Sequence, residues 1–221
     1  HHIVEQTPAN LANFGAEAIH NTSNLVRLPH GPGKIHNQIS GFYSSKQPFT
    51  GGQTVRQWLS KQSFGAIQLH AEWRAPAGRP VNGQSGGNSG IFLMGMYEVQ
   101  VLQSHNNKTY PDGQAGSLYG QCPPLVNATT PQGEWQSYDV IFTPPVYEGE
   151  KVKEPAYVTI IHNGVVVQNH RPYLGPSSHK TLASYPKNHP ETGPIRLQFH
   201  GDPMEFRNFW VRPLGEYDTE K

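Results

Sequence analysis

Apolar and polar residues alternate along most of the chain from about residue 64 onward. In residues 67–74, apolar Ile, Leu, Ala and Trp stand at every second position between Gln, His, Glu and Arg, which predicts a strand with one buried face. Residues 86–94 predict a glycine-bent approach followed by a short strand, and residues 96–102 predict a second strand. Strands spaced this way, without long helices between them, indicate an antiparallel sandwich.

The second of these strands places Glu98 and Gln100 on the face opposite Tyr97, Val99 and Val101. A strand fixes the direction of its side chains, so the carboxylate and the amide are presented together as a rigid polar pair. An ordinary solvated face of an antiparallel sheet also carries a polar residue at every second position. The pair alone therefore leaves two interpretations open, a binding surface and a wet face.

More strands are predicted toward the C-terminus. Asn-Gly at positions 163–164 stands between two of them and is the strongest short signal for a tight hairpin. The last two lie on either side of Gly201-Asp202-Pro203, and we expect them to form another hairpin-like pair. The predicted strands cover residues 138–142, 157–161, 165–167, 195–199 and 206–211.

Residues 1–63 lack a clear pattern, and we expect an N-terminal arm packed on the same domain, with a short helix or strand over residues 54–59. Residues 64–221 then form the β-sandwich, a usual size for one undivided all-β domain. The connections 104–136 and 168–194 are rich in Gly, Pro, His and Tyr. Long connections in a compact domain often carry functional residues, so we expect them near the site.

The composition agrees with short strands and tight turns, because 23 Gly and 20 Pro stand against only 15% charged residues. A formal net charge of +1 argues against nucleic acid as a partner, since phosphate binding needs clustered Lys and Arg. No apolar run approaches the ~18–20 residues that cross a bilayer, so no membrane span is expected. The single cysteine, Cys122, leaves the fold to packing rather than to internal disulfides.

Polar rows of similar chemistry occur on separate predicted strands. They favour His, Arg, Gln and Glu over the Lys, Thr and Ser of a purely solvated face. Sugar hydroxyls bind planar bidentate groups of this kind, and aromatic rings stack on the apolar side of a pyranose. We therefore expect one saccharide-binding face, on which Glu72 and Arg74 can pair along their strand. The rows are His70, Glu72 and Arg74; Glu98 and Gln100; and Arg196, Gln198 and His200.

Other site chemistries have less support. No pair of histidines has the spacing of a zinc motif on one element, so no metal ligand or cofactor is assigned, and a divalent metal stays open only through long-range assembly. No Gly-x-Ser-x-Gly nucleophile elbow is present. Sandwich glycosidases present Glu-x-Asp-x-x-Glu, but the matching positions here are Glu98, Gln100 and Gln103. A retaining mechanism needs two carboxyl groups about 5 Å apart, so it is disfavoured on this strand.

Several short motifs follow one another over roughly residues 64 to 214. They are Asn88-Ser89-Gly90-Ile91-Phe92, Tyr97-Glu98-Val99-Gln100-Val101-Leu102, Gly116-Ser117-Leu118-Tyr119-Gly120, Gly133-Glu134-Trp135-Gln136-Ser137-Tyr138-Asp139, His162-Asn163-Gly164, and His200-Gly201-Asp202-Pro203 followed by Phe206-Arg207-Asn208. In this order they resemble the DUF1080, or 3-keto-disaccharide hydrolase, family. The N-terminal arm matches that family poorly.

The resemblance implies an all-β fold, an antiparallel two-sheet jelly-roll sandwich of the concanavalin A or laminin G type with little helix. It also implies a protein exported by bacteria, periplasmic or extracellular, that cleaves glycosides already oxidised at C3. A ketone at C3 acidifies the C2 proton, so a modest base removes it and the C1 aglycone leaves by elimination. Addition of water afterwards gives net hydrolysis.

For that reaction we assign Glu98 and His200 as the catalytic pair, one as base and the other as acid, and the sequence leaves open which residue has which role. Both are expected around one open cleft, within about 10 Å of each other. Arg74, Gln100 and Tyr119 are predicted to orient the sugar and polarise its ketone. The full set of predicted substrate-binding residues is Glu72, Arg74, Asn88, Gln100, His105, Tyr119, Gln198 and Arg207.

The chain departs from the family pattern at Met94, Gln103 and Phe199, where relatives often have Arg, Asp and Asp. Two other functions therefore stay open: a non-catalytic carbohydrate-binding module on the same sandwich, and a glycoside hydrolase acting on unmodified glycans. For His200 the competing interpretation is a turn histidine bonded to Asp202. For Tyr119 and Asn88 it is a loop residue that bonds the backbone.

Overall fold

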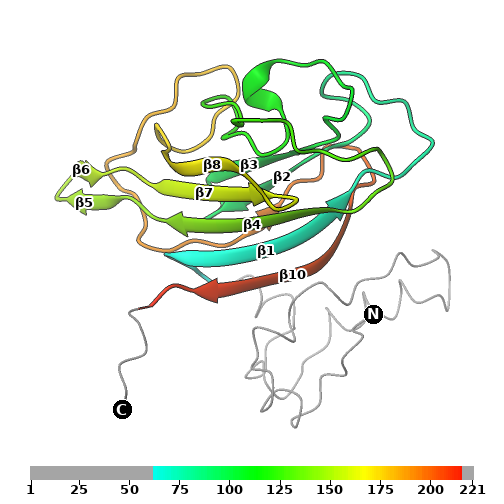
Figure 1. Cartoon of the computed structure of the whole chain (residues 1–221). Helices are drawn as coiled ribbons and strands as arrows, with labels where there is room; N and C mark the ends of the chain where they lie inside the picture. Colours follow the sequence, from blue (N-terminus) through cyan, green and yellow to red (C-terminus); the bar gives the residue numbers. More distant parts are fainter. Residues whose placement is uncertain (1–61, 216–221) are drawn as a thin grey trace, which may run out of the picture.

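The computed structural model describes residues 62–215, and their strands pair only in antiparallel fashion (Figure 1). One sheet has the strand order β10-β1-β4-β7-β8, a second has the order β3-β2-β9, and β5 and β6 form a separate pair. This confirms the predicted all-β, two-sheet jelly-roll sandwich. The strands are β1 (Ile67–Arg74), β2 (Asn88–Leu93), β3 (Tyr97–Leu102), β4 (Gln136–Thr143), β5 (Val146–Glu148), β6 (Lys151–Glu154), β7 (Tyr157–His162), β8 (Val165–Pro172), β9 (Arg196–Leu197) and β10 (Glu205–Pro213); a 3-10 turn covers Pro111–Gly113.

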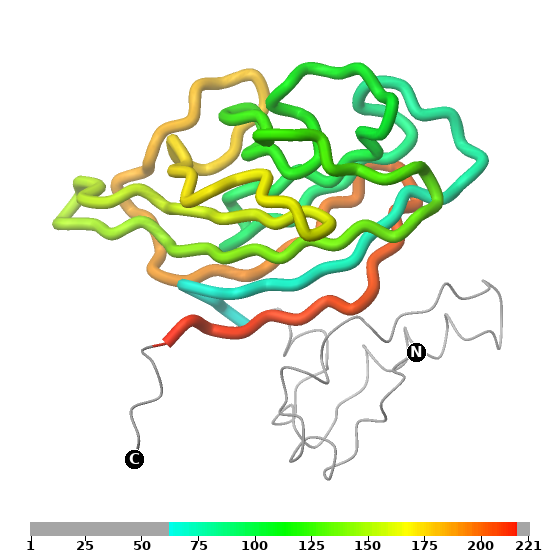
Figure 2. The backbone as a smooth tube through the Cα atoms, in the orientation of Figure 1, coloured from blue at the N-terminus to red at the C-terminus, as the bar shows by residue number. Residues whose placement is uncertain are grey.

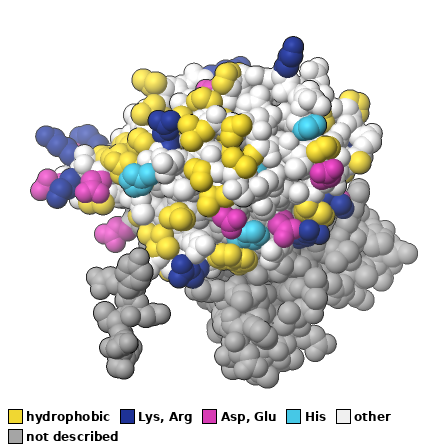
Figure 3. All heavy atoms as spheres, in the orientation of Figure 1, with side chains coloured by type: hydrophobic (Ala, Val, Ile, Leu, Met, Phe, Trp, Pro, Cys, Tyr) yellow, Lys and Arg dark blue, Asp and Glu magenta, His cyan; other side chains and the backbone are white. Residues whose placement is uncertain are grey.

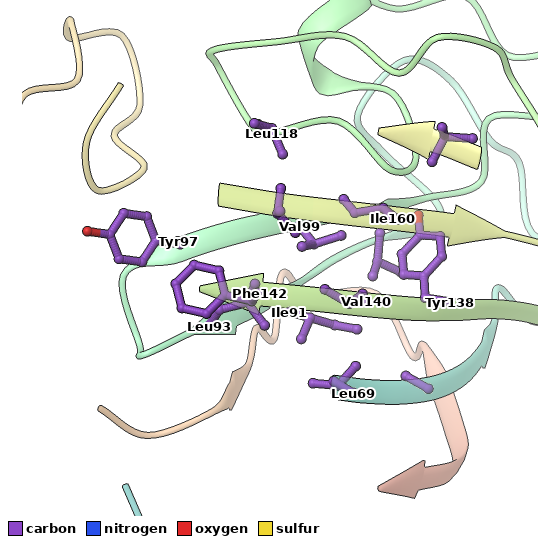
Figure 4. Packing of buried hydrophobic residues seen from close by; sticks show 14 of the residues in the cluster. Leu69, Ile91, Leu93, Tyr97, Val99, Leu118, Tyr138, Val140, Phe142 and Ile160 are labelled. Atoms are coloured by element: carbon purple, nitrogen blue, oxygen red, sulfur yellow. The ribbon is translucent and has the colours of Figure 1, made fainter. Parts of the chain in front are cut away.

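The core lies between the two sheets and is built by the alternation that the sequence shows. In β1 every second residue is buried, so Leu69 and Trp73 point inward while their neighbours face outward. Figure 4 shows side chains from β1, β2, β3, β4 and β7 meeting in one cluster. Each fully buried side chain of this size contributes about 1.5–3 kcal/mol to stability, so the sandwich is held by packing.

The tight hairpin predicted at Asn163-Gly164 is confirmed between β7 and β8. His162 pairs with Val165, which leaves two residues in the turn. Asn163 and Gly164 have φ of 51° and 79°, the left-handed conformation that a type I′ turn requires at both positions. The turn is also anchored from outside, because Oδ1 of Asn163 accepts a hydrogen bond of 2.8 Å from the backbone N–H of Ser137.

The second predicted hairpin, between residues 195–199 and 206–211, is wrong. β9 pairs with β2 in the smaller sheet, whereas β10 pairs with β1 in the larger one, so the chain crosses between sheets at this point. β9 is also shorter than expected, because Leu197 is 40% and Phe199 83% exposed, and neither supports a buried face. Alternation predicts that strands exist, but it does not say which open sheet edge each one joins.

The two long connections, now residues 103–135 and 173–195, lie beside each other over the smaller sheet (Figure 2). Gln121 joins them, since its Nε2 donates to the carbonyl of Gly175 at 3.0 Å and its Oε1 accepts from the N–H of Leu174 at 2.7 Å. The first connection also pairs with the free edge of β3, where Gly116 donates to the carbonyl of Gln100 at 2.9 Å. These hydrogen bonds therefore hold both connections against β3.

Charged side chains gather over the projecting hairpin of β5 and β6, and other charges on the visible face are mixed in sign (Figure 3). Within residues 62–215, no helix has the length and apolar character that spanning a membrane would require. Nearly all of the predicted N-terminal arm, with the helix or strand over residues 54–59, lies outside the described residues.

Candidate active site

A pocket of about 290 Å³ opens on the outer face of the smaller sheet, under the two long connections. Its volume is near the lower end of the range for small-molecule sites. The sheet supplies the floor, and the connections supply the walls. The lining residues are Asn88, Phe92, Glu98, Gln100, Tyr119, Ser177, Ser178, His179, Gln198 and His200.

The floor follows from strand periodicity. Asn88 and Phe92 have the same parity along β2, and Glu98 and Gln100 have the same parity along β3, so all four face away from the core. Phe92 and Glu98 are also direct cross-strand partners. Gln198 joins them because its backbone N–H donates to the carbonyl of Gly90 at 2.9 Å, which extends the pairing beyond β9.

Glu98 is the central group of this floor. The side chain is not solvated as on a wet face, since Glu98 is only 4% and Gln100 only 1% exposed. Burial penalises the charged carboxylate and raises the pKa of Glu98 from 4.5 to about 7. A pKa near the working pH suits a group that takes up and releases protons.

Gln100 lies beside the Glu98 carboxyl on the pocket floor. Its Nε2 donates to Oε1 of Gln84 at 3.0 Å and to Oδ1 of Asn88 at 3.3 Å. With the amide turned over, the same nitrogen would instead face Oε1 of Glu98 at 3.3 Å and the carbonyl of Ser89 at 3.2 Å. The polar pair predicted from β3 is thus a carboxyl beside an amide that neighbouring amides hold in place.

The Asn88-Ser89-Gly90 motif lies on β2 next to the Glu98 side chain and leaves room for it. Nδ2 of Asn88 donates to the carbonyl of Gln84 at 2.9 Å, so this side chain has a backbone-bonding role as well as a place in the pocket lining. Ser89 points the other way and its hydroxyl donates to the carbonyl of Gln198 at 2.7 Å. At Gly90, an added Cβ would overlap Oε1 of Glu98. Only glycine leaves room for that carboxyl.

His200 lies in the crossing between β9 and β10 and lines the same pocket as Glu98. Both residues therefore line one pocket, as expected, and their catalytic roles stay a prediction. Asp202 does not bond His200; its Oδ2 accepts hydrogen bonds from the backbone N–H groups of Gly86 and Asn88, at 3.1 and 3.0 Å. Asp202 thus ties the loop that carries His200 to the start of β2.

We expect Asp202→Ala to destabilise the protein by about 1–3 kcal/mol, because two N–H donors lose a charged acceptor. Asp202→Asn keeps an acceptor oxygen of the same shape and should lose less. Urea unfolding of both variants measures the difference. Equal stability of Asp202→Ala and the wild type would contradict this anchoring role.

Tyr119 reaches the pocket from the first long connection and meets His179 from the second. The Tyr119 hydroxyl lies 2.9 Å from Nδ1 of His179 and 2.9 Å from the hydroxyl of Tyr110. Burial, followed by the hydrogen bond to Tyr110 and the nearby Glu98, raises the pKa of Tyr119 above its ordinary value. Tyr119 is therefore a neutral phenol beside the Glu98 carboxyl.

Three predicted binding residues lie elsewhere. Glu72 and Arg74 face outward from β1 in the larger sheet, and Arg207 lies beside them on β10. The expected pairing of Glu72 with Arg74 is wrong, because Arg207 bonds Glu72 and Arg74 donates to Glu205 at 2.6 Å. Neighbours two residues apart on a strand are farther from each other than partners across the ladder.

The prediction of one continuous polar face is therefore wrong. The His70, Glu72 and Arg74 row belongs to the larger sheet, where His70 bonds Asp139 at 2.7 Å and stacks on Trp210. The guanidinium groups of Arg74 and Arg207 cover the ring of Trp135 at 4.6 and 4.0 Å. This network is satisfied internally and does not line the pocket.

His105 also lies outside the pocket, where its Nδ1 contacts the carbonyl of Thr129 at 3.1 Å. Among the aromatic residues that could stack on a sugar, Trp73 and Tyr97 are core residues, and Tyr119 lines the pocket. No group of three or more His, Cys, Asp or Glu side chains in residues 62–215 is arranged to hold a metal ion.

Sequence reasoning missed four lining residues: Phe92, Ser177, Ser178 and His179. Phe92 could have been found, since it has the parity of Asn88 on a predicted strand. The other three have no periodic signal because they lie in the second connection. Ser177 reaches the site through its hydroxyl, which accepts a hydrogen bond of 2.9 Å from the N–H of Glu98.

The family model of the 3-keto-alpha-glucoside-1,2-lyase-like domain matches residues 33–212. The match includes β1 to β9 and all of β10 except its last residue, Pro213. The chain belongs to this family. No curated protein matches it.

The chain is also similar to solved structures. A crystal structure from Parabacteroides distasonis ATCC 8503, named "putative glycosyl hydrolase", is 48% identical with a TM-score of 0.65, covering 70% of this chain and 66% of that one. Another structure of the same name and organism is 20% identical with a TM-score of 0.48, covering 70% and 81%. The family and the first of these structures together indicate a carbohydrate-active, glycosyl hydrolase-like domain.

Proposed function

We propose that this protein cleaves 3-keto-glycosides by removal of the C2 proton and elimination of the C1 aglycone. The observation that carries the proposal is the composition of the pocket lining. Among the lining residues in the described chain, Glu98 is the single carboxylic acid, and it is accompanied by histidines, amides and a tyrosine. Inverting and retaining glycosidases act through a pair of carboxyl groups, whereas elimination beside a ketone needs one base.

Glu98 is the base in this mechanism. Its carboxylate takes the proton from C2, and the electron pair of that C–H bond forms the C2–C3 double bond while the C3 oxygen becomes negative. The ketone then re-forms, a C1–C2 double bond is made, and the C1–O bond breaks. His200 donates a proton to the leaving oxygen. Addition of water across the new double bond returns a proton to C2 and a hydroxyl to C1, which amounts to hydrolysis.

The remaining floor supplies recognition of the sugar. Oε1 of Gln198 is buried without a hydrogen-bond partner, so a hydroxyl donated by a ligand would satisfy it. Asn88 and Gln100 add further amide groups, and Phe92 offers an apolar surface. A saccharide presents both kinds of surface, which supports the choice of ligand.

The test uses a 3-keto-glucoside with a chromogenic aglycone beside the same glucoside without oxidation. Release from the keto compound alone is expected and would support the proposal. Binding of either compound without release would replace it by a carbohydrate-binding module. Release from the plain glucoside at a similar rate would instead indicate an ordinary glycoside hydrolase.

A further inference from the structure

A hydrogen-bonded chain of three side chains closes one wall of the pocket. The Tyr110 hydroxyl contacts the Tyr119 hydroxyl at 2.9 Å, and the Tyr119 hydroxyl contacts Nδ1 of His179 at 2.9 Å. The rings of Tyr119 and His179 are stacked, with centroids 6.2 Å apart and planes inclined by 15°. Tyr119 and His179 line the pocket, whereas Tyr110 stands behind them and is 41% exposed.

The three hydrogen-bonded side chains are held in place by separate segments of the backbone. Tyr119 follows the stretch that pairs with β3, and its N–H points to the carbonyl of Glu98 at 3.4 Å. The ring of Tyr110 packs over Gly113, where a Cβ would overlap it. His179 comes from the other connection, next to the Ser177 that receives the N–H of Glu98. The phenol and the carboxyl are thus positioned by the same stretch of β3.

Tyr119 has one proton and two neighbours that can compete for it. If Nδ1 of His179 carries no proton, it accepts a hydrogen bond from the Tyr119 hydroxyl. The Tyr119 proton then points at His179 and not into the pocket. If Nδ1 is protonated and the Tyr110 hydroxyl also donates, the phenol oxygen accepts both bonds and the Tyr119 proton is free to point into the pocket. In the pocket, the substrate oxygen that becomes negative during elimination needs a hydrogen-bond donor.

We propose that Tyr119 donates a hydrogen bond to the C3 oxygen of the substrate, and that His179 is a positioning residue which turns the Tyr119 proton toward it. The proposal rests on the proposed function and assigns the electrophilic role that Glu98 and His200 leave open. As the C2 proton moves to Glu98, the C–H electron pair forms the C2–C3 double bond and the π pair of the ketone moves onto the C3 oxygen, where the Tyr119 O–H stabilises the charge. The bond returns to its initial state when the ketone re-forms.

Tyr119→Phe tests the donor. Loss of one such donor usually lowers the rate about 10²–10³-fold, so we expect kcat to fall by that factor with little change in KM. The loss should be the same for good and poor aglycones, because the hydrogen bond acts on enolate formation and not on departure of the aglycone. A loss confined to poor aglycones would show instead that Tyr119 serves the leaving oxygen.

His179 is tested by two substitutions. His179→Asn keeps a side-chain donor near the position of Nδ1 and should retain most of the rate, whereas His179→Leu should approach the loss of Tyr119→Phe. The double variant Tyr119→Phe with His179→Leu should be no slower than Tyr119→Phe alone, because both changes remove one function. His170→Asn is the control, since His170 is exposed on β8 and stacks on Tyr157 outside the pocket.

The outcomes separate the two proposals. A wild-type protein that releases no aglycone from the keto compound would overturn the proposed function. An active wild type whose Tyr119→Phe variant stays within threefold would overturn only the assignment of Tyr119. Additive losses in the double variant, or no rescue by His179→Asn, would show that His179 does not position the Tyr119 proton.

Discussion

Replacing Glu98 with Gln is expected to lower the rate of aglycone release from a 3-keto-glucoside by about 10²–10⁴-fold. The amide has the shape of the carboxyl but cannot take the C2 proton, and no second carboxyl lines the described pocket to replace it. Binding of the keto compound should persist, because the recognition groups remain. Initial rates together with a binding titration check both parts. An unchanged rate would show that Glu98 is not the base.

The pH dependence of the free energy of unfolding distinguishes a folded Glu98→Gln variant from a misfolded one. Burial raises the pKa of Glu98 from 4.5 in the unfolded chain to about 7 in the fold. The folded state therefore binds the proton more tightly, so its stabilisation is fully present below about pH 4.5 and is lost as the pH rises through 7. From the size of this shift, the loss is roughly 3 kcal/mol.

Glu98→Gln cannot ionise and should lack this contribution to the pH dependence. Its stability relative to the wild type is therefore expected to increase from pH 5 to pH 8. Urea unfolding at the two pH values measures the difference. A parallel loss of stability in both proteins would mean that Glu98 is not the buried titrating group.

Gly90→Ala is expected to reduce activity about 10²-fold, the cost that a displacement of the order of 1 Å can have at a reacting centre. An alanine Cβ would overlap Oε1 of Glu98 and lie 3.0 Å from its carboxyl carbon, so the carboxyl must move away from its place beside Gln100. Alanine suits the backbone of a strand better than glycine. The fold should therefore survive, and the effect should fall on kcat.

Two comparisons make this prediction specific. Gly215→Ala is a matched control, because an added Cβ there meets nothing within 4 Å, and its rate should equal that of the wild type. The double variant Gly90→Ala with Glu98→Gln should be no slower than Glu98→Gln alone, since the base is already absent. A further loss in the double variant would show that Gly90 matters for something other than the position of Glu98.

Local patterns predicted the strands well. The alternation in residues 67–74 matches β1 in both bounds and burial, and Asn163-Gly164 forms the expected turn. The 195–199 segment fails because alternation of Ile, Leu and Phe does not ensure burial, and Phe199 is 83% exposed among the described residues. The pattern signals a strand only when the tertiary structure provides a partner for its apolar face.

The candidate site was predictable in part for the same reason. Glu98 and Gln100 face the same way because strand periodicity dictates it, and Tyr119 and His200 were found through motifs. Arg74 and Arg207 have equally suitable chemistry but belong to the outer face of the other sheet. His179 has no motif or period of its own. Its place at the pocket depends on a connection whose path is set by distant contacts such as that of Gln121 with Gly175.

The sequence by itself determined the class of fold, the direction of side chains along each strand and the family. Those properties depend on backbone geometry that repeats every two residues and on short motifs. Only the tertiary structure decided which polar row became a pocket. Glu98 and Glu72 alternate in the same way along their strands, but the connection that follows β3 and a second one distant in sequence cover β3, whereas Arg207 pairs with Glu72 on the other sheet. Removal of water by that cover, and not the sequence pattern, raises the pKa of Glu98 to about 7.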